Sequence, residues 1–320
     1  MKDVNILLVK PSTPLVMDAL DAAFTLHRLD QQDDPDAWLA EHGDSIRGIV
    51  SSASFALDGA LMDKLPNLEI ASNFGVGYDN VDVAAARDRG VMVTHTRSVL
   101  DEEVADTALA LILMTLRNLI PAERYVRSGE WEAKGAFPLG KYTMKGSVLG
   151  IVGLGRIGKE IARRAEAFGM QIAYTGRRKQ DDQPYAYHAS VTDLAAEADV
   201  LLNCAPGGAG TFHMIDAGVL AALGPDGILI NIGRGTTVDE TALIAALRDG
   251  TIAGAGLDVF ETEPNVPEAL RKLENTVLLP HIGSATIPTR DAMGQLVVDN
   301  LTNWFDKGSA LTPVPECAKT

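Results

Sequence analysis

Short runs of β-forming apolar residues alternate with amphipathic helical stretches along the whole chain, and this alternation constrains the fold more than any other feature. A strand, a helix and a second strand in succession form a crossover that makes the two strands parallel. The pattern runs in two series, and we expect their strands at residues 4–9, 49–52 and 91–94, then at 148–152, 171–174, 200–203, 228–232, 254–259 and 277–280. The sequence therefore predicts an α/β fold with two open parallel-sheet domains and a ligand cleft between them.

Composition and charge exclude several classes of protein. The chain has 320 residues, which suits about two domains. Its formal net charge of −15, from 43 acidic and 28 basic side chains, repels nucleic acid phosphates. The apolar runs fall short of the ~20 residues that cross a bilayer, and no secretory signal precedes the first expected strand. The two cysteines, Cys204 and Cys317, are too few for a disulfide framework or a metal cluster. We expect a cytoplasmic protein without nucleic acid, membrane or metal partners.

A complete G-x-G-x-x-G motif follows the expected strand at 148–152 and opens a helical stretch. Its residues are Gly153, Leu154, Gly155, Arg156, Ile157 and Gly158. In this context the first glycine permits a tight turn, the second lets the backbone approach a pyrophosphate, and the third permits close helix–strand packing. The phosphates would lie on the N-terminus of the helix. The motif predicts a Rossmann-like dinucleotide-binding domain.

The segment after the next expected strand indicates which dinucleotide binds. NAD sites place an acidic residue about 20 positions after the glycine loop, where it binds the ribose 2′-hydroxyl. Here the segment carries Arg177, Arg178 and Lys179, and no acidic residue precedes Asp181. Consecutive cations in an acidic chain suit the additional 2′-phosphate of NADP. The sequence therefore favours NADP(H), with NAD(H) as the alternative cofactor.

Polar residues at the ends of other expected strands indicate a catalytic site. Arg234, Glu263 and His281 each follow an apolar strand, and open α/β sheets bind ligands at the carboxyl ends of their strands. In the first series, the paired glycines around Val76 and Gly77 could hold a small carboxylate on backbone N–H groups. The joint placement of these residues favours chemistry over a purely structural role.

Several segments resemble the D-isomer-specific 2-hydroxyacid dehydrogenase family. They are residues 148–168, 231–235 (Asn-Ile-Gly-Arg-Gly), 256–264 (Gly-Leu-Asp-Val-Phe-Glu-Thr-Glu-Pro) and 279–284 (Leu-Pro-His-Ile-Gly-Ser). Within the family, residues 127–168 are most similar to the NADPH-dependent glyoxylate/hydroxypyruvate reductase branch. The resemblance extends over nearly the whole chain, and it implies reduction of a small 2-keto acid to the D-2-hydroxy acid.

The resemblance also implies roles for individual residues. His281 would protonate the carbonyl oxygen, Glu263 would favour the charged form of His281, and Arg234 would bind the keto acid and polarise its carbonyl. The backbone at Val76 and Gly77 would hold the substrate carboxylate. Outside the glycine loop and the basic run, the implied cofactor contacts are Asp258 at the nicotinamide amide, Cys204 and Pro206 beside the adenosine, and Ile232 and Gly283.

The architecture of the family is a further expectation. It implies a discontinuous substrate domain of residues 1–99 plus 286–320, and a dinucleotide-binding domain of residues 100–285. It also implies a homodimer around the helix expected at 101–117, whose apolar residues cover more than one face. Trp131 would lie at the substrate pocket of a neighbouring subunit.

Alternative substrates and functions remain open. A phosphoglycerate dehydrogenase would need a cation near residues 50–57, and this stretch contains none. Small keto acids without a charged tail are therefore favoured: glyoxylate, hydroxypyruvate, pyruvate or an aryl pyruvate. A transcriptional corepressor of the C-terminal-binding-protein type would bind the dinucleotide as a scaffold without turnover. A formate dehydrogenase would pair its histidine with glutamine, where this chain has Glu263.

Overall fold

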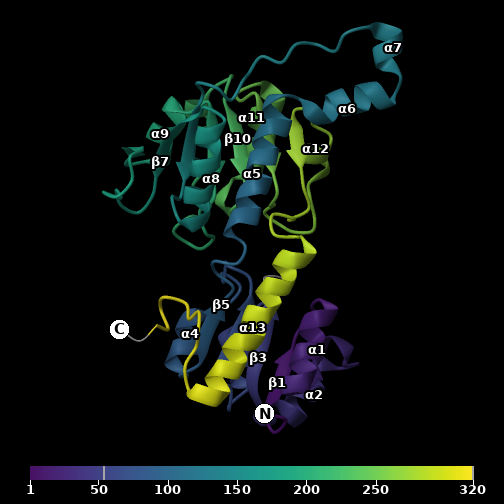
Figure 1. Ribbon diagram of the computed structural model, residues 1–320, viewed down its shortest axis with the longest axis vertical. Helices are drawn as coiled ribbons and strands as arrows, with labels where there is room; N and C mark the ends of the chain where they lie inside the picture. Colours follow the sequence, from purple (N-terminus) through teal and green to yellow (C-terminus); the bar gives the residue numbers. More distant parts are fainter. Residues whose placement is uncertain (53–54, 319–320) are drawn as a thin grey trace. The chain divides into compact units, whose positions relative to one another are not determined.

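The computed structural model describes residues 1–52 and 55–318 of the protein. These residues divide into two compact units, which are Met1–Leu100 with Ser284–Thr320 (unit 1) and Asp101–Gly283 (unit 2). The predicted α/β fold class is confirmed, since each unit contains an open sheet whose paired strands run parallel (Figure 1). Ala53 and Ser54, which belong to the stretch used against a phosphate substrate, lie outside the described residues.

Unit 1 is a sheet covered by helices on both faces. Its strands are β1 (Asn5–Leu8), β2 (Thr25–Arg28), β3 (Ile46–Ser52), β4 (Ile70–Phe74) and β5 (Met92–His95), in the order β2-β1-β3-β4-β5. One face carries α1 (Pro14–Ala23) and α13 (Ile287–Lys307), and the other carries α2 (Pro35–His42), α3 (Gly59–Asp63) and α4 (Val83–Asp88). Successive strand residues point to opposite faces, so Ile6 and Leu8 join the core under α1 and α13, while Leu7 and Val9 join the other core.

Unit 2 contains a longer sheet of the same kind. Its strands are β6 (Val148–Val152), β7 (Gln171–Thr175), β8 (Ala186–His188), β9 (Val200–Asn203), β10 (Ile228–Asn231), β11 (Gly254–Leu257) and β12 (Thr276–Leu278), in the order β12-β11-β10-β9-β6-β7-β8. The order reverses between β6 and β9, because the chain moves outward from β6 in one direction and from β9 in the other. Ligands of open α/β sheets bind beyond the carboxyl ends of the strands at such a reversal.

The helices of unit 2 cover both faces of this sheet. The helices α5 (Asp101–Leu116) and α8 (Arg156–Ala167) pack together on one face, and α9 (Val191–Glu197), α10 (Ala217–Leu223) and α11 (Glu240–Asp249) pack on the other. The short α12 (Glu268–Arg271) precedes β12. Many helix starts are fixed by a side chain that accepts the N–H three residues on, as at Asp34, Asp58, Asp82, Ser190, Asp216, Asp239 and Thr286.

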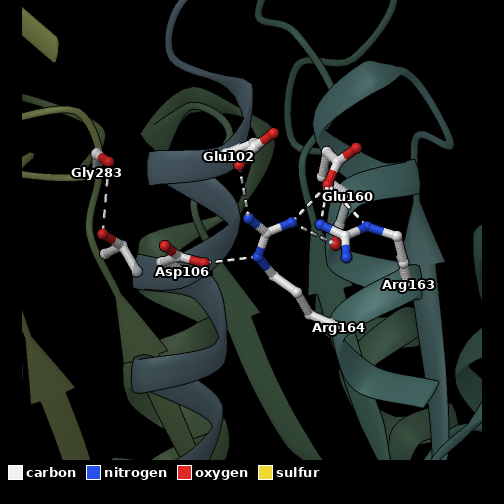
Figure 2. A network of polar contacts seen from close by, with 7 residues as sticks. Glu102, Asp106, Glu160, Arg163, Arg164 and Gly283 are labelled. Carbon is white, nitrogen blue, oxygen red and sulfur yellow. Dashed lines mark hydrogen bonds and ion pairs between the residues drawn. The ribbon is translucent and has the colours of Figure 1, made fainter. Parts of the chain in front are cut away.

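The long helix α5 packs within its own unit, and half of its residues are buried. It packs against α8, β10 and β11, and its buried residues are Val104, Ala105, Ala108, Leu109, Leu111, Ile112, Thr115 and Leu116. Arg164 of α8 lies between the acidic residues of α5 and Glu160 of its own helix (Figure 2). Its Nη2 lies 3.5 Å from Glu102 Oε2, its Nε lies 2.6 Å from Asp106 Oδ1, and its Nη1 lies 2.5 Å from Glu160 Oε2. The packing inside unit 2 accounts for the apolar residues on more than one face of α5, which the sequence analysis related to a partner subunit.

The segment after α5 leaves the sheet of unit 2. It forms α6 (Leu119–Arg127) and α7 (Glu130–Lys134), which Figure 1 shows extending away from the rest of the unit. Large hydrophobic side chains remain exposed there, namely Leu119, Val126, Trp131 and, beyond α7, Leu139. Among the described residues, no single helix is long and apolar enough to cross a membrane. The helices α5 and α6 pass that test only as a pair, across a bend of 66°.

Candidate active site

The glycine-rich loop after β6 has the shape that a dinucleotide site requires. Gly153 has a φ of +96°, which favours glycine. A Cβ on Gly158 would lie 2.5 Å from the carbonyl oxygen of Gly153, so only glycine lets α8 pack this closely on the loop. Around Gly155, in contrast, no atom of the described residues lies within 4 Å of a Cβ position. That open side is where the backbone can approach a pyrophosphate.

The first turn of α8 is also suited to a phosphate. Gly155 is the N-cap and has no side chain to accept the first N–H groups of the helix, which begins at Arg156. The helix dipole adds partial positive charge at the same end. The side chain of Arg156 is paired with α5, since its Nε lies 3.2 Å from Asp101 Oδ2. The loop and the helix start therefore fit the pyrophosphate of a bound dinucleotide.

The basic run lies in the exposed turn after β7, where it consists of Arg177, Arg178 and Lys179. The next residue fixes the position of this turn. Gln180 Nε2 donates to the carbonyl oxygen of Leu154 in the glycine loop (2.7 Å), and the N–H of Gln180 donates to Tyr174 Oη (2.7 Å). The turn that carries the cations is therefore tied to the glycine loop. The sequence analysis missed Gln180, because a side-chain bond between two loops has no periodic pattern.

Cys204 begins the loop after β9 and packs against the glycine loop. Its Sγ lies 2.8 Å from the carbonyl oxygen of Gly153 and 3.3 Å from the Cβ position of Gly158. Burial raises the pKa of this thiol to about 12. Further along the loop, Thr211 Oγ1 donates to the carbonyl oxygen of Pro206 (2.7 Å). Cys204 therefore packs against the glycine loop at the reversal point between β6 and β9.

The loops after β11 and β12 bring Glu263 and His281 together. Glu263 Oε2 lies 2.7 Å from His281 Nδ1, and Glu263 Oε1 accepts the N–H of Phe260 at 3.0 Å. A carboxylate can only accept, so the Nδ1 proton points toward Glu263 and Nε2 takes no part in this pair. His281 has a φ of +54°, a backbone conformation that costs a non-glycine residue roughly 1–3 kcal/mol and is common at functional sites.

Asp258, directly after β11, anchors the segment that carries His281. Its carboxylate is buried, and its two oxygens accept the N–H groups of Ile282 (2.7 Å) and Gly283 (2.8 Å). Its carbonyl oxygen accepts the N–H of His281 at 2.8 Å. The sequence analysis assigned Asp258 to the cofactor alone. The structure shows that Asp258 also holds the backbone conformation of the His281 loop.

Arg234 follows β10, and its charge acts on Glu263. Burial raises the pKa of the Glu263 carboxyl, but the hydrogen bonds from His281 and Phe260, with the charges of His281 and Arg234, outweigh it and leave that pKa below its usual value. Burial also raises the pKa of Asp258, and there the two backbone N–H groups only partly oppose it. Glu263 is therefore ionised at neutral pH and can stabilise a protonated imidazole.

The other predicted substrate contacts lie elsewhere in the chain. Val76 and Gly77 belong to unit 1, where their carbonyl oxygens accept hydrogen bonds from His95 Nδ1 and Asn73 Nδ2, each at 2.9 Å. Trp131 lies on α7 with 61% of its surface exposed. Within unit 2, the structure brings together Arg234, Glu263 and His281 but not Trp131.

Comparison with known proteins identifies the family. Residues 109–283 match the D-isomer specific 2-hydroxyacid dehydrogenase, NAD binding domain. The chain belongs to this family. The dehydrogenase is 49% identical to an NADPH-dependent glyoxylate/hydroxypyruvate reductase from Sinorhizobium meliloti, whose crystal structure with NADP and malonate matches over 98% of each chain with a TM-score of 0.92.

Curated relatives of the dehydrogenase cover almost the same length. A glyoxylate/hydroxypyruvate reductase of Arabidopsis thaliana is 47% identical over 98% of this chain and 100% of that protein. A hydroxyphenylpyruvate reductase of Plectranthus scutellarioides is 46% identical over the same shares. The resemblance seen in the sequence is therefore confirmed at the level of the family.

The dehydrogenase has two further polar contacts at Glu261, close to Glu263 in the chain, whose residues the sequence analysis did not single out. Glu240 Oε1, at the start of α11, accepts the N–H of Glu261 at 2.8 Å. Glu261 Oε1 in turn lies 2.8 Å from His213 Nε2. The sequence analysis assigned a role to Glu263 in this segment and none to Glu261, Glu240 or His213.

Replacing Glu263 by Gln in the dehydrogenase should remove a contribution to stability that depends on pH. The folded-state pKa of Glu263 lies below the ordinary value of 4.5, so its ionised carboxylate stabilises the fold above that pH. The contribution is lost as the pH falls through the folded-state pKa. We expect Glu263→Gln to unfold at lower urea concentration than wild type near neutral pH, and the difference to shrink on acidification. The exposed Glu268→Gln is the control, and a difference that grows in acid would contradict the assignment.

Proposed function

We propose that this dehydrogenase uses NADPH to reduce a small 2-keto acid, glyoxylate or hydroxypyruvate, to the D-2-hydroxy acid. The observation that carries the proposal is the 2.7 Å pair between His281 Nδ1 and Glu263 Oε2, on which the charge of Arg234 also acts. The relatives support it, because the Sinorhizobium meliloti enzyme is an NADPH-dependent glyoxylate/hydroxypyruvate reductase and the Arabidopsis thaliana relative carries the same activity in its name.

His281 would be the acid in this reaction. In its imidazolium form both ring nitrogens carry protons, and Glu263 holds the one on Nδ1. The proton on Nε2 would pass to the carbonyl oxygen as negative charge develops there. The left-handed backbone of His281 and its bond to Asp258 keep the ring in one orientation. In the oxidative direction, neutral His281 would take the same proton back.

Arg234 would bind the keto acid and polarise its carbonyl. A guanidinium can hold a carboxylate through paired N–H bonds, and its charge stabilises the developing alkoxide. The side-chain amide of Asn231 donates through Nδ2 to the carbonyl oxygen of Arg234 at 3.0 Å and steadies the start of the loop after β10. Val76 and Gly77 remain the proposed backbone contacts of the substrate carboxylate.

The cofactor would lie on the glycine loop and supply the hydride when bound. Gly155 and the N-terminus of α8 would hold its pyrophosphate, because that side of the loop is open and the first-turn N–H groups have no side-chain cap among the described residues. The cations tied to this loop through Gln180 would bind the 2′-phosphate of NADP(H), with NAD(H) as the weaker cofactor. The remaining proposed cofactor contacts are Leu154, Ile157, Cys204, Pro206, Ile232, Asp258 and Gly283.

A second substrate class has specific support. The hydroxyphenylpyruvate reductase of Plectranthus scutellarioides is 46% identical to the chain over 98% of its length, nearly as similar as the glyoxylate/hydroxypyruvate reductase of Arabidopsis thaliana. An aryl pyruvate is therefore the alternative substrate. A dinucleotide-binding scaffold is the alternative that involves no turnover.

The proposed activity is tested by following the loss of reduced nicotinamide absorbance with NADPH or NADH and each of glyoxylate, hydroxypyruvate, pyruvate and phenylpyruvate. We expect the fastest oxidation with NADPH and glyoxylate or hydroxypyruvate. A preference for NADH would overturn the 2′-phosphate assignment, and fastest turnover of phenylpyruvate would favour the aryl pyruvate class. If the protein binds NADPH but turns over none of these keto acids, the proposed reductase activity is wrong and the scaffold function is favoured.

The control for this experiment is a variant without the proposed acid. His281→Ala should lower kcat about 10²- to 10⁴-fold, the usual contribution of a general acid, with NADPH affinity nearly unchanged. His188→Ala, on β8 in the same unit, should leave both quantities unchanged. An equal loss of turnover and NADPH binding in His281→Ala would contradict its assignment as the acid.

We also propose that the dehydrogenase is a homodimer formed through the segment α6–α7. Exposed apolar side chains that extend from a fold are typical of an interface, and Trp131 would then contact the neighbouring subunit. Light scattering should give a mass of about twice the 34.0 kDa of one chain. The double change Val126→Ser with Trp131→Ser should give monomers, whereas Phe168→Ser, at the exposed C-cap of α8, should not. A monomeric wild type would contradict the proposal.

The proposed compartment is the cytoplasm. Within the described residues, Cys204 and Cys317 form no disulfide, which suits a reducing environment. A tagged chain should fractionate with cytosolic markers, and its recovery in a secreted or organelle fraction would contradict this proposal.

A further inference from the structure

The peptide between Phe260 and Glu261 is held from three directions. Its N–H donates to Glu240 Oε1 at 2.8 Å. The chain at Gly235 packs so closely on this peptide that a Cβ there would overlap the Phe260 carbonyl group. The side chain of Glu261 lies 2.8 Å from His213 Nε2. The peptide therefore has little freedom to move, although it makes none of the contacts proposed for substrate or cofactor.

This peptide adjoins a short series of hydrogen bonds that ends at the proposed acid. The N–H of Phe260, which belongs to the preceding peptide, donates to Glu263 Oε1 at 3.0 Å, and Glu263 Oε2 lies 2.7 Å from His281 Nδ1. Because the two peptides share the Cα of Phe260, a displacement of the Phe260–Glu261 peptide would shift the N–H that Glu263 accepts, and a shift of Glu263 would move the imidazole ring. The position of His281 Nε2 therefore depends on what holds the Phe260–Glu261 peptide.

Glu240 is a rigid support for that peptide. It is the first residue of α11, directly after Asp239, whose side chain caps the helix by accepting the N–H of Ala242. Glu240 as a whole residue is only 7% exposed. Burial and the negative charges of Glu261 and Glu263 raise the pKa of its carboxyl. The hydrogen bond from the N–H of Glu261 opposes this rise but does not cancel it.

A buried acid beside other carboxylates is unfavourable unless its hydrogen bonds compensate. An apolar side chain would fill the same space without repelling Glu261 and Glu263, but it would leave the part-buried N–H of Glu261 without this acceptor. A polar group that loses its hydrogen-bond partner on the way out of water is destabilising. The acceptor function of Glu240 is therefore the feature that explains a polar side chain at this position.

We propose that Glu240 is a positioning residue for the proton transfer, because it fixes the peptide from which Glu263 reaches His281. The inference rests on the proposed role of His281 as the acid. Glu240 itself touches neither the imidazole nor the reacting atoms. A misplacement of about 1 Å at a reacting group can cost ~100-fold in rate, so loss of this support is expected to appear in kcat.

The first test compares steady-state kinetics of Glu240→Ala and Glu240→Gln with wild type. We expect Glu240→Ala to lower kcat about 10- to 100-fold while the KM for NADPH stays within about twofold. Glu240→Gln should recover kcat to within about threefold of wild type, since its amide oxygen can accept the same N–H. The matched control is Glu268→Ala, the exposed first residue of α12. An unchanged kcat in Glu240→Ala, or a Gln variant as slow as the Ala variant, would overturn the proposal.

The second test does not depend on turnover. Hydrogen exchange of the segment 258–263, followed by mass spectrometry, should be about tenfold faster in Glu240→Ala than in wild type and near wild type in Glu240→Gln. Equal exchange in wild type and Glu240→Ala would overturn the support role. If wild type reduces no keto acid, the proposed function fails and the exchange result still decides whether Glu240 holds the peptide.

A third variant covers the case in which Glu240→Ala does not fold. Glu240→Asp keeps the charge but withdraws the acceptor by one methylene, so it should show the slower kcat and the faster exchange. Wild-type values for Glu240→Asp in both measurements would overturn the proposal. Thermal unfolding of each variant establishes that the kinetic differences belong to folded protein.

Discussion

The parallel direction of the strands in unit 2 is the constraint on which the candidate site depends. Because every paired strand of its sheet points the same way, the loops that follow the strands all leave at one edge. The glycine loop after β6, the basic turn after β7 and the loop after β9 meet there, and Gln180 and Cys204 bond them to one another. Groups separated by up to 51 positions in the sequence are thereby neighbours.

The carboxyl groups of the site show that their hydrogen-bond partners decide the direction in which their pKa values shift. Burial pushes the pKa of Glu263, Asp258 and Glu240 upward in each case. Only Glu263 receives a hydrogen bond from a side chain that can carry positive charge, and its pKa falls below the usual value. Asp258 and Glu240 receive hydrogen bonds from neutral backbone N–H groups, and their pKa values rise. This separation gives Glu263 the charge that a proton donor needs beside it, and leaves the other two as anchors.

Much of this arrangement could be predicted from the sequence, because strands and the residues after them have local patterns. The predicted strands at 148–152 and 200–203 coincide with β6 and β9, and the catalytic candidates follow apolar strands as expected. The predicted strand at 254–259 is too long, since β11 ends at Leu257 and Asp258 turns to bind the His281 loop. The edge strands β2 and β8 were not predicted, because short edge strands need few apolar residues.

The contacts that escaped prediction share a physical cause. Gln180 with Leu154, and Glu240 with Glu261, join loops that are far apart in sequence through a single side-chain bond each. Such bonds have no period and depend on the folded path of both loops. The apolar coverage of α5 was ambiguous for a related reason, since a sequence does not reveal whether α8 or a partner subunit covers a given face.

The burial of Cys204 has a consequence for how the protein meets oxidants and electrophiles. With a thiol pKa of about 12, only about one sulfur in 10⁵ is a thiolate at neutral pH, and the thiolate is the reactive form. The sulfur is also packed between the glycine loop and the start of α8. Alkylation or oxidation of Cys204 is therefore disfavoured while the glycine loop keeps this packing. The rate at which a reagent modifies this sulfur would then report on how tightly the nucleotide-binding edge is packed.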